Sequence, residues 1–363
     1  MSFQQLLGFQ EKVVFDLRSL YNTYGYGQYK MSKFEEYDLY AKNKDFLISD
    51  SVITFTDLGG KLMALKPDVT LSIVKNTKDV PCGVKKLYYN ENIYRVAKGS
   101  GAFREMMQVG LECIGDVDSF CIGEVLTLAA KSLASISEDC VLNISDLGLL
   151  TALLDEFGFP ASEREPVLRA IAQKNTHELV RMADSFGVSG EKVQKLMEIL
   201  SKNDSPASVL ALVSEISEAM SGHAKRVREI LSCVEEDVLP MLRFDFSVVD
   251  DIHYYNGIVF KGYISGVPES VLSGGQYDKL MRKMNRSSNA IGFAVYLDAL
   301  EHMYRQSNTY DVDVLILYSG SVKPELVSIK ANALRQEGKR VMVQKAIPEG
   351  LRYASLLDMT GEE

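Results

Sequence analysis

The first 115 residues show two kinds of apolar spacing. Val13, Leu17 and Tyr21 recur every four positions, which predicts an amphipathic helix over residues 11–24 that ends at Gly25. Short strand-like runs follow at 52–56, 62–65, 86–90 and 109–113, and a second helix is expected over 118–133 with Asp118 as its N-cap. This part of the chain therefore predicts an antiparallel sheet framed by helices.

The remainder of the chain shows two further patterns. Between 136 and 236, five amphipathic stretches are separated by Gly, Pro, Asn and Ser, at 149–160, 163–172, 177–186, 190–200 and 206–220. They predict a helical insertion. The tail reads as strand, helix and strand, at 312–317, 324–337 and 340–344, which is the beginning of an α/β domain.

Composition narrows the class of protein. The 363 residues are 46% hydrophobic and 25% charged, enough for one large core and one or two smaller domains. We expect no membrane segment, because no apolar stretch approaches the roughly 20 residues that span a bilayer, and we expect a cytoplasmic location. The five cysteines lack CxxC spacing and only four histidines accompany them, so no metal site is expected. A net charge of −9 argues against a nucleic-acid partner.

Residues 244–260 carry the most specific motif. The stretch resembles the histidine-specific signature of class II histidyl-tRNA synthetases, Leu-Val-Arg-Gly-Leu-Asp-Tyr-Tyr-Thr, and Tyr254 and Tyr255 match its tyrosine pair. Asp250 stands where the family has the arginine that stabilises the adenylate transition state. A carboxylate there repels ATP phosphates.

Residues 57–70 resemble a second run of the same family, in which Leu-Arg-Pro-Glu-Gly-Thr offers a carboxylate and a hydroxyl to the substrate's α-amino group. Asp68 and Thr70 occupy those positions, and such a pair suits an ammonium. The alternative is that both residues only cap a helix over 71–75. Because the tyrosine motif occurs in the same chain, we favour substrate binding over capping for these two residues.

Residues 92–112 are similar to class II motif 2. Arg95, Arg104, Gln108 and Glu112 match its pattern, whereas Ala97 replaces an acidic residue. Gln108 and Glu112 lie four apart on a strand, so both face one side. The alternative is an ordinary exposed strand with polar residues outward.

Residues 288–300 resemble motif 3, with two departures. Ala299 replaces the arginine that meets the γ-phosphate, and Tyr296 replaces a glycine. In the preceding Gly274-Gly275 run, Gln276 replaces an arginine. Each lost charge-assisted contact removes about 1.5–3 kcal/mol, so we expect no adenylate formation.

The family resemblance covers about residues 1–135 and 235–303. The helical series after Asp146 is more similar to the ATP phosphoribosyltransferase regulatory subunits, synthetase paralogues that activate the short catalytic subunit of the first enzyme of histidine biosynthesis. The resemblance implies an α+β fold with a class II synthetase-like antiparallel sheet flanked by helices. The expected divisions are a core of residues 1–135 and 237–305, a helical insertion of 136–236, and a partial α/β segment of 306–363.

The same resemblance implies a non-catalytic regulatory subunit that mediates histidine feedback and needs no cofactor. The expected partner is the short catalytic subunit, in a hetero-octamer that contains a homodimer of this chain. The histidine contacts that it implies are Asp68 and Thr70 at the α-ammonium, Arg95 and Gln108 at the carboxylate side, and Glu112, Tyr254 and Tyr255 at the imidazole. Two alternatives stay open: an active histidyl-tRNA synthetase, and a histidine-binding module with another partner.

Overall fold

The computed structural model describes residues 7–44, 47, 52–79, 82–97, 100–249, 254–300, 303 and 310–361. The chain divides into two compact units, one of residues 13–300 and one of residues 1–12 and 301–363. Each unit is described by itself.

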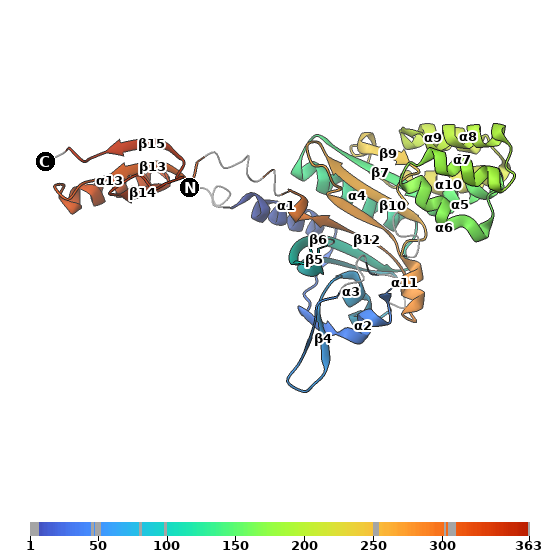
Figure 1. The fold of residues 1–363 in the computed structure, drawn as a ribbon, viewed down its shortest axis with the longest axis horizontal. Coiled ribbons are helices and arrows are strands. Elements are labelled where there is room, and N and C mark those ends of the chain that lie inside the picture. The colour runs from blue at the N-terminus through green and yellow to red at the C-terminus, as the bar shows by residue number, and fades with distance from the viewer. Residues whose placement is uncertain are drawn as a thin grey trace. The chain divides into compact units, whose positions relative to one another are not determined.

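The larger unit is built on a nine-stranded sheet (Figure 1). Its strands, in spatial order, are β1 (Gly27–Gln28), β5 (Val84–Val96), β6 (Phe103–Gly115), β12 (Asn289–Tyr296), β11 (Leu272–Gln276), β10 (Ile258–Ile264), β7 (Cys140–Asp146), β9 (Leu242–Asp245) and β8 (Asn203–Asp204). Neighbouring strands are antiparallel except for the parallel pairs β1/β5 and β7/β9. The expected α+β fold, with a largely antiparallel sheet flanked by helices, is confirmed.

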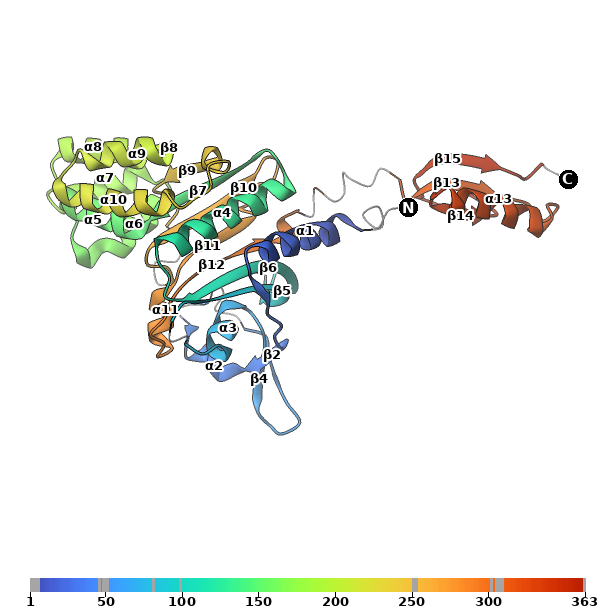
Figure 2. The same ribbon diagram turned by 180° about the vertical axis from the view of Figure 1, so that it is seen from behind.

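Two helices, α1 (Phe9–Thr23) and α4 (Ser119–Ile136), cover one face of this sheet, as the view from behind shows (Figure 2). The Tyr21 hydroxyl lies 3.0 Å from Ser132 Oγ and so joins the two helices, and the Tyr21 ring lies 6.0 Å from the Phe293 ring of β12. Asp118 accepts a hydrogen bond from Cys121 N at 2.9 Å, which confirms the predicted N-cap of α4. The apolar stripe of α1 is therefore buried, as its four-residue spacing in the sequence predicted.

Helix α4 is the one helix among the described residues whose length and apolarity would suffice to cross a membrane. In the structure 61% of that stretch is buried inside the protein. A core helix passes the same test, so α4 is weak evidence for a span.

A smaller layer lies on the opposite face of the sheet. It contains the three-stranded antiparallel sheet β2 (Phe34–Glu36), β4 (Leu62–Leu65) and β3 (Thr54–Thr56), with the helices α2 (Tyr37–Ala41), α3 (Thr70–Asn76) and α11 (Asp278–Lys283). Leu71 and Ile73 of α3 pack with Tyr89 of β5 and with Tyr254 and Tyr277 in one apolar cluster. The β4–α3 turn is thereby held against the sheet.

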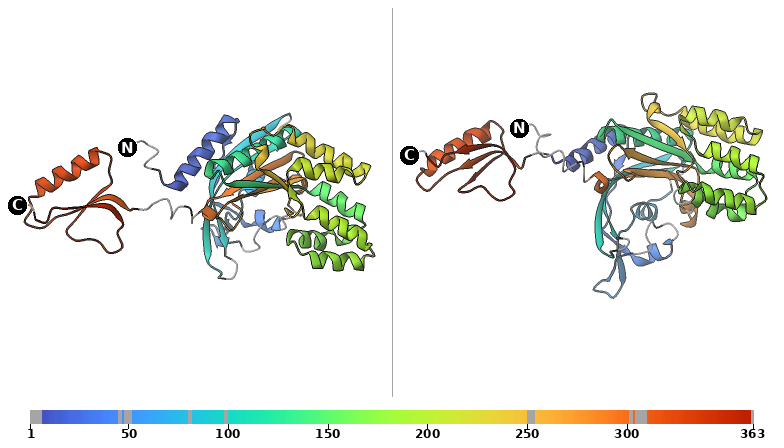
Figure 3. Two further views of the ribbon diagram at one scale, coloured as in Figure 1. Left: turned by 90° about the horizontal axis from the view of Figure 1, so that it is seen from above. Right: turned by 45° about the horizontal axis from the view of Figure 1, so that its top comes forward.

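The helical series predicted between the two sheet segments is present. It comprises α5 (Leu147–Phe157), η3 (Ala161–Glu163), α6 (Arg164–Ala172), α7 (Thr176–Ser185), α8 (Gly190–Leu200), α9 (Pro206–Ser214) and α10 (Glu218–Leu231). These helices gather beside β7 and β9 (Figure 3). Short turns η4 (Leu239–Met241) and η5 (Leu297–Leu300) precede β9 and follow β12. The domain boundaries expected from the sequence stay a prediction.

Within residues 310–361, the smaller unit is a parallel sheet with one helix. Strands β14 (Val341–Gln344), β13 (Val312–Leu317) and β15 (Tyr353–Asp358) pair in that order, and α13 (Pro324–Gln336) connects β13 to β14. Val314 and Ile316 pack with Val327 and Ala331 of α13 in a separate core. The third strand, β15, was not foreseen from the sequence.

Candidate functional site

Glu112 of β6 is the centre of a buried cluster. Glu112 is 2% exposed, and each of its two carboxylate oxygens accepts a hydrogen bond from a different residue. Thr70 Oγ1 donates to Oε1 at 2.8 Å, and the Tyr277 hydroxyl donates to Oε2 at 2.6 Å. Burial raises the pKa of Glu112 to about 8, the Asp68 carboxylate adds to the rise, and the two hydroxyl donors oppose it. The cluster can hold a proton near neutral pH.

Glycines on neighbouring strands leave room for this cluster. Gly292 of β12 lies opposite Glu112, and a Cβ atom there would lie 1.8 Å from Glu112 Oε2. Gly110 lies opposite Tyr89, and a Cβ atom there would lie 2.5 Å from the Tyr89 hydroxyl. No side chain fits at either glycine without displacing the carboxylate or the phenol.

Asp68 and Thr70 have separate roles at the start of α3. Asp68 Oδ1 accepts a hydrogen bond from Leu71 N, in the first turn of α3, at 2.8 Å. Thr70 instead turns its hydroxyl to Glu112. Burial raises the pKa of Asp68, while hydrogen bonds and nearby Arg95 oppose the rise. The pair therefore brings one carboxylate and one hydroxyl to the Glu112 cluster.

Arg95 and Lys66 tie the β4–α3 turn to β5. Arg95 Nε donates to the carbonyl oxygen of Pro67 at 3.1 Å. The Lys66 side chain is fully buried and its Nζ lies 2.9 Å from Glu91 Oε2. These contacts fix the backbone directly before Asp68.

Gln108 lies on the same face of β6 as Glu112 and is 5% exposed. Its register partners are Glu91 on β5 and Tyr296 on β12. The alternative of an exposed strand with outward polar residues is wrong for Gln108 and Glu112, because the helices of the smaller layer and the neighbouring strands bury both.

Tyr254 and Tyr255 precede β10. The Tyr254 ring lies 4.7 Å from the Tyr255 ring and 5.8 Å from the Tyr277 ring. Burial raises the pKa of Tyr254, with Asp68 acting in the same direction and a hydrogen bond with Thr70 acting against it. The predicted tyrosine pair thus reaches the cluster, whereas Asp250 lies outside the described residues.

Sequence reasoning missed Tyr277, although it noted the glycine run before it. Tyr277 follows Gln276, whose Oε1 accepts from Ile258 N at 3.0 Å and fixes the start of β10. Two signals pointed to Tyr277: it directly follows the Gly274-Gly275 run that resembles the family, and it lies directly after a buried strand.

The region that resembles motif 3 is filled by Tyr296. Its hydroxyl lies 2.6 Å from Ser273 Oγ on β11, and burial raises its pKa. Ala299 lies in η5, directly after this strand. A phenol therefore occupies the position where the family resemblance expects a glycine.

Comparisons with known proteins agree with this geometry. The family model of histidyl-tRNA synthetase matches residues 8–300. The chain is 26% identical over 341 residues to the ATP phosphoribosyltransferase regulatory subunit of Oceanobacillus iheyensis, covering 92% of this chain and 84% of that protein. It is 27% identical over 352 residues to the histidine–tRNA ligase of Methanocaldococcus jannaschii, covering 93% and 83%.

Two solved structures show the same fold. An ATP phosphoribosyltransferase regulatory subunit/histidyl-tRNA synthetase from Bacillus halodurans matches with a TM-score of 0.75 and 23% identity, over 97% of this chain and 94% of that one. A chain of the ATP phosphoribosyl transferase (HisG:HisZ) complex from Thermotoga maritima matches with a TM-score of 0.60 and 22% identity, over 82% and 98%.

Proposed function

Because the chain belongs to the histidyl-tRNA synthetase family, we propose that it is the regulatory subunit of ATP phosphoribosyltransferase, activating a short catalytic subunit and mediating histidine feedback. The name of its Oceanobacillus relative supports this assignment, as does the likeness to a chain of the Thermotoga complex.

One contrast carries the proposal. The half of the site that would hold an amino acid keeps its buried groups, with Glu112 bonded by Thr70 and Tyr277. The half that would hold ATP has lost two cations, since Asp250 and Ala299 stand at the family's arginine positions. Without them, negative charge that develops on a phosphate has no arginine partner at these positions.

Histidine is the proposed ligand. Asp68 offers a carboxylate to its α-ammonium together with the Thr70 hydroxyl, and Arg95 and Gln108 lie on the side proposed for its carboxylate. Glu112, Tyr254 and Tyr255 meet the imidazole, where an acid and two phenols satisfy ring nitrogens. A Glu112 carboxyl that titrates at about 8 can either donate to neutral imidazole or pair with imidazolium.

Feedback would act by linkage. Histidine that binds one assembly state more tightly than another shifts the population toward that state by the difference in binding free energy. We propose that this chain acts as a homodimer in a cytoplasmic hetero-octamer with the catalytic subunit, without a cofactor, a membrane segment or nucleic acid.

The first experiment measures formation of phosphoribosyl-ATP from ATP and phosphoribosyl pyrophosphate by a short-form catalytic subunit. We expect activity only when this chain is added, and lower activity when histidine is added. A catalytic subunit that behaves identically with and without this chain overturns the proposal.

The second experiment separates the regulatory function from synthetase activity. We expect no histidine-dependent exchange between ATP and pyrophosphate. Exchange by the unmodified chain would restore the synthetase alternative, which the Methanocaldococcus relative represents. Histidine binding without any effect on the catalytic subunit would instead favour a histidine-binding module with another partner.

A further inference from the structure

Two cysteines lie together where the first turn of α4 meets the sheet. Cys113 of β6 is fully buried, and Cys121, in the first turn of α4, is 8% exposed. A hydrogen bond joins the two thiols. Neither belongs to the proposed histidine site, although Cys113 directly follows Glu112 in the sequence. Neighbouring residues of a strand project to opposite faces, so the thiols lie on the face of the sheet that the helices cover.

Contacts of neighbouring residues hold the two thiols in this place. Lys86 lies opposite Cys113 in the register of β5 and β6, and Glu124 follows Cys121 by three residues in α4. Lys86 Nζ lies 2.7 Å from a carboxylate oxygen of Glu124, and the Tyr26 hydroxyl donates to Glu124 Oε1 at 3.3 Å. This ion pair joins the position beside Cys113 to the helix turn that carries Cys121.

The surroundings make the two thiols chemically different. The hydrogen bond with Cys113 lowers the pKa of Cys121, burial acts against this shift, and the backbone at Asp118 adds to it. The same hydrogen bond and burial both raise the pKa of Cys113. A thiolate is the reactive form of cysteine, and a helix N-terminus favours it. Cys121 is therefore the thiol that ionises first, and it is also the one with exposed surface.

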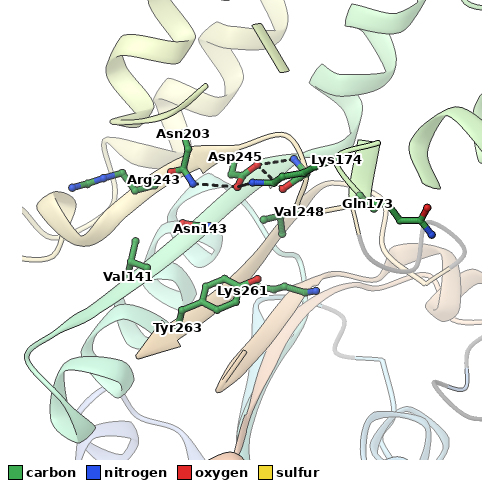
Figure 4. A pocket seen from close by; sticks show the side chains of 12 residues that line it. Val141, Asn143, Gln173, Lys174, Asn203, Arg243, Asp245, Val248, Lys261 and Tyr263 are labelled. Carbon is green, nitrogen blue, oxygen red and sulfur yellow. Dashed lines mark hydrogen bonds and ion pairs between the residues drawn. The ribbon is translucent and has the colours of Figure 1, made fainter. Parts of the chain in front are cut away.

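Cys140 has the opposite character. It begins β7, and its register partner on β10 is Ile264 rather than a cysteine. Burial and the Asp139 carboxylate both raise the pKa of Cys140. Further along the strand, Val141 and Asn143 line the pocket beside the helical insertion (Figure 4). Cys140 is therefore a suitable reference thiol for the pair beneath α4.

We propose that Cys113 and Cys121 form a reversible disulfide when the protein meets hydrogen peroxide. The Cys121 thiolate attacks one peroxide oxygen, the O–O bond breaks, and the released hydroxide takes a proton and becomes water. The Cys113 sulfur then attacks the sulfenic acid on Cys121. The S–S bond forms, and the hydroxyl group leaves as water with the Cys113 proton. Two thiols and one hydrogen peroxide thus give one disulfide and two water molecules.

The disulfide would join α4 covalently to β6, the strand that carries Glu112 and Gln108. In reducing compartments, disulfides are usually transient and catalytic or redox-sensing, and a reversible bond of this kind fits that use. The inference goes beyond the proposed function, because it needs neither histidine nor a catalytic partner.

The first measurement is a thiol count on the folded full chain after treatment with hydrogen peroxide. Cys82 is exposed, so the count uses the Cys82→Ser variant, in which four of the five cysteines remain. We expect the number of thiols that react after unfolding to fall from four to two, and dithiothreitol to restore four.

Mass spectrometry of the unmodified chain identifies the bond. Trypsin cuts after Arg104 and after Lys131, and the peptide 105–131 contains Cys113, Cys121 and no other cysteine. After peroxide, its mass should fall by two hydrogen atoms. A second cut after Glu112 should leave two fragments that stay linked until dithiothreitol is added.

Three variants separate the two steps. Cys140→Ser is the matched control and should still form the linked fragments. Cys113→Ser should form none, and its Cys121 should carry an added oxygen atom, because the partner of the second step is missing. Cys121→Ser should leave Cys113 unmodified. Oxygen on Cys113 in Cys121→Ser, or an unmodified Cys121 in Cys113→Ser, would overturn the order of attack.

Two results with the unmodified chain would overturn the proposal itself. One is a peptide 105–131 that keeps its reduced mass while Cys82 is oxidised. The other is a disulfide that joins Cys121 to a cysteine other than Cys113.

Discussion

The Tyr277 hydroxyl donates to Glu112 Oε2 at 2.6 Å, although 165 residues separate the two in the sequence. This bond joins the end of β11 to the middle of β6, with Gly292 on the strand between them. It makes the protonation of Glu112 depend on the packing of three strands.

Glu112→Gln tests the titration of this carboxyl. Because the folded pKa, about 8, is raised above the usual value, folding favours the protonated form. Stability from this group is therefore full below its usual pKa and falls as pH rises toward 8, by at most ~1.4 kcal/mol per pH unit. We expect urea unfolding of Glu112→Gln to lose that slope, and Glu191→Gln on the exposed surface of α8 to keep it. A variant with the unmodified slope would contradict this assignment.

Tyr277→Phe should leave a buried acceptor unsatisfied. We expect a loss of about 1–3 kcal/mol in the free energy of unfolding. The loss should be greater at pH 9 than at pH 6, because the hydroxyl stabilises the ionised form of Glu112 and its removal raises the pKa further. Thr70→Val should act in the same way, and a double-mutant cycle should show coupling between the two donors. Equal losses of unfolding free energy at pH 9 and pH 6 would contradict this prediction.

Gly292→Ala should be strongly destabilising. The added Cβ would lie 1.8 Å from Glu112 Oε2 and 2.5 Å from the Leu111 carbonyl oxygen, which is backbone and cannot turn aside. Overpacking of this kind costs typically about 1–3 kcal/mol. Gly222→Ala in α10 is the matched control, since nothing lies within 4 Å of its Cβ position, and it should be neutral or stabilising. Thermal unfolding of both variants measures the difference.

Lys66→Met tests the buried ion pair beside Asp68. The fully buried ammonium lies 2.9 Å from Glu91, whose side chain is 15% exposed. Removing one partner leaves a largely buried charge, at a cost of roughly 3 kcal/mol. Lys61→Met removes an exposed pair with Glu36 and should leave the unfolding free energy almost unchanged. Similar losses of unfolding free energy for both variants would show that burial does not determine how much the Lys66 ion pair contributes to stability.

Local signals predicted much of the fold and only part of the site. The N-cap at Asp118 and the apolar stripe of α1 depend on neighbours in sequence, and both are present in the structure. The family motifs also brought Thr70 and Glu112 into one site. The contact of Tyr277 with Glu112 could not be predicted, because it depends on how β11 and β6 pack around Gly292.

The split role of Asp68 and Thr70 shows the same limit. Both residues suit a helix cap by type, and only the position of Glu112 on β6 decides that Thr70 turns toward the site.

The parallel pairing of β7 with β9 has an evolutionary consequence. The insertion leaves the sheet at the end of β7 and returns as β9 beside the same strand, in parallel register with Leu142 opposite Leu242. Because the two strands run parallel, the inserted helices form the crossover from one end of the strand pair to the other, and they can change in length while every strand register from β1 to β7 is retained. The helices of the insertion can therefore change as a unit, and a new binding specificity can arise in them while the residues of the amino-acid site stay the same.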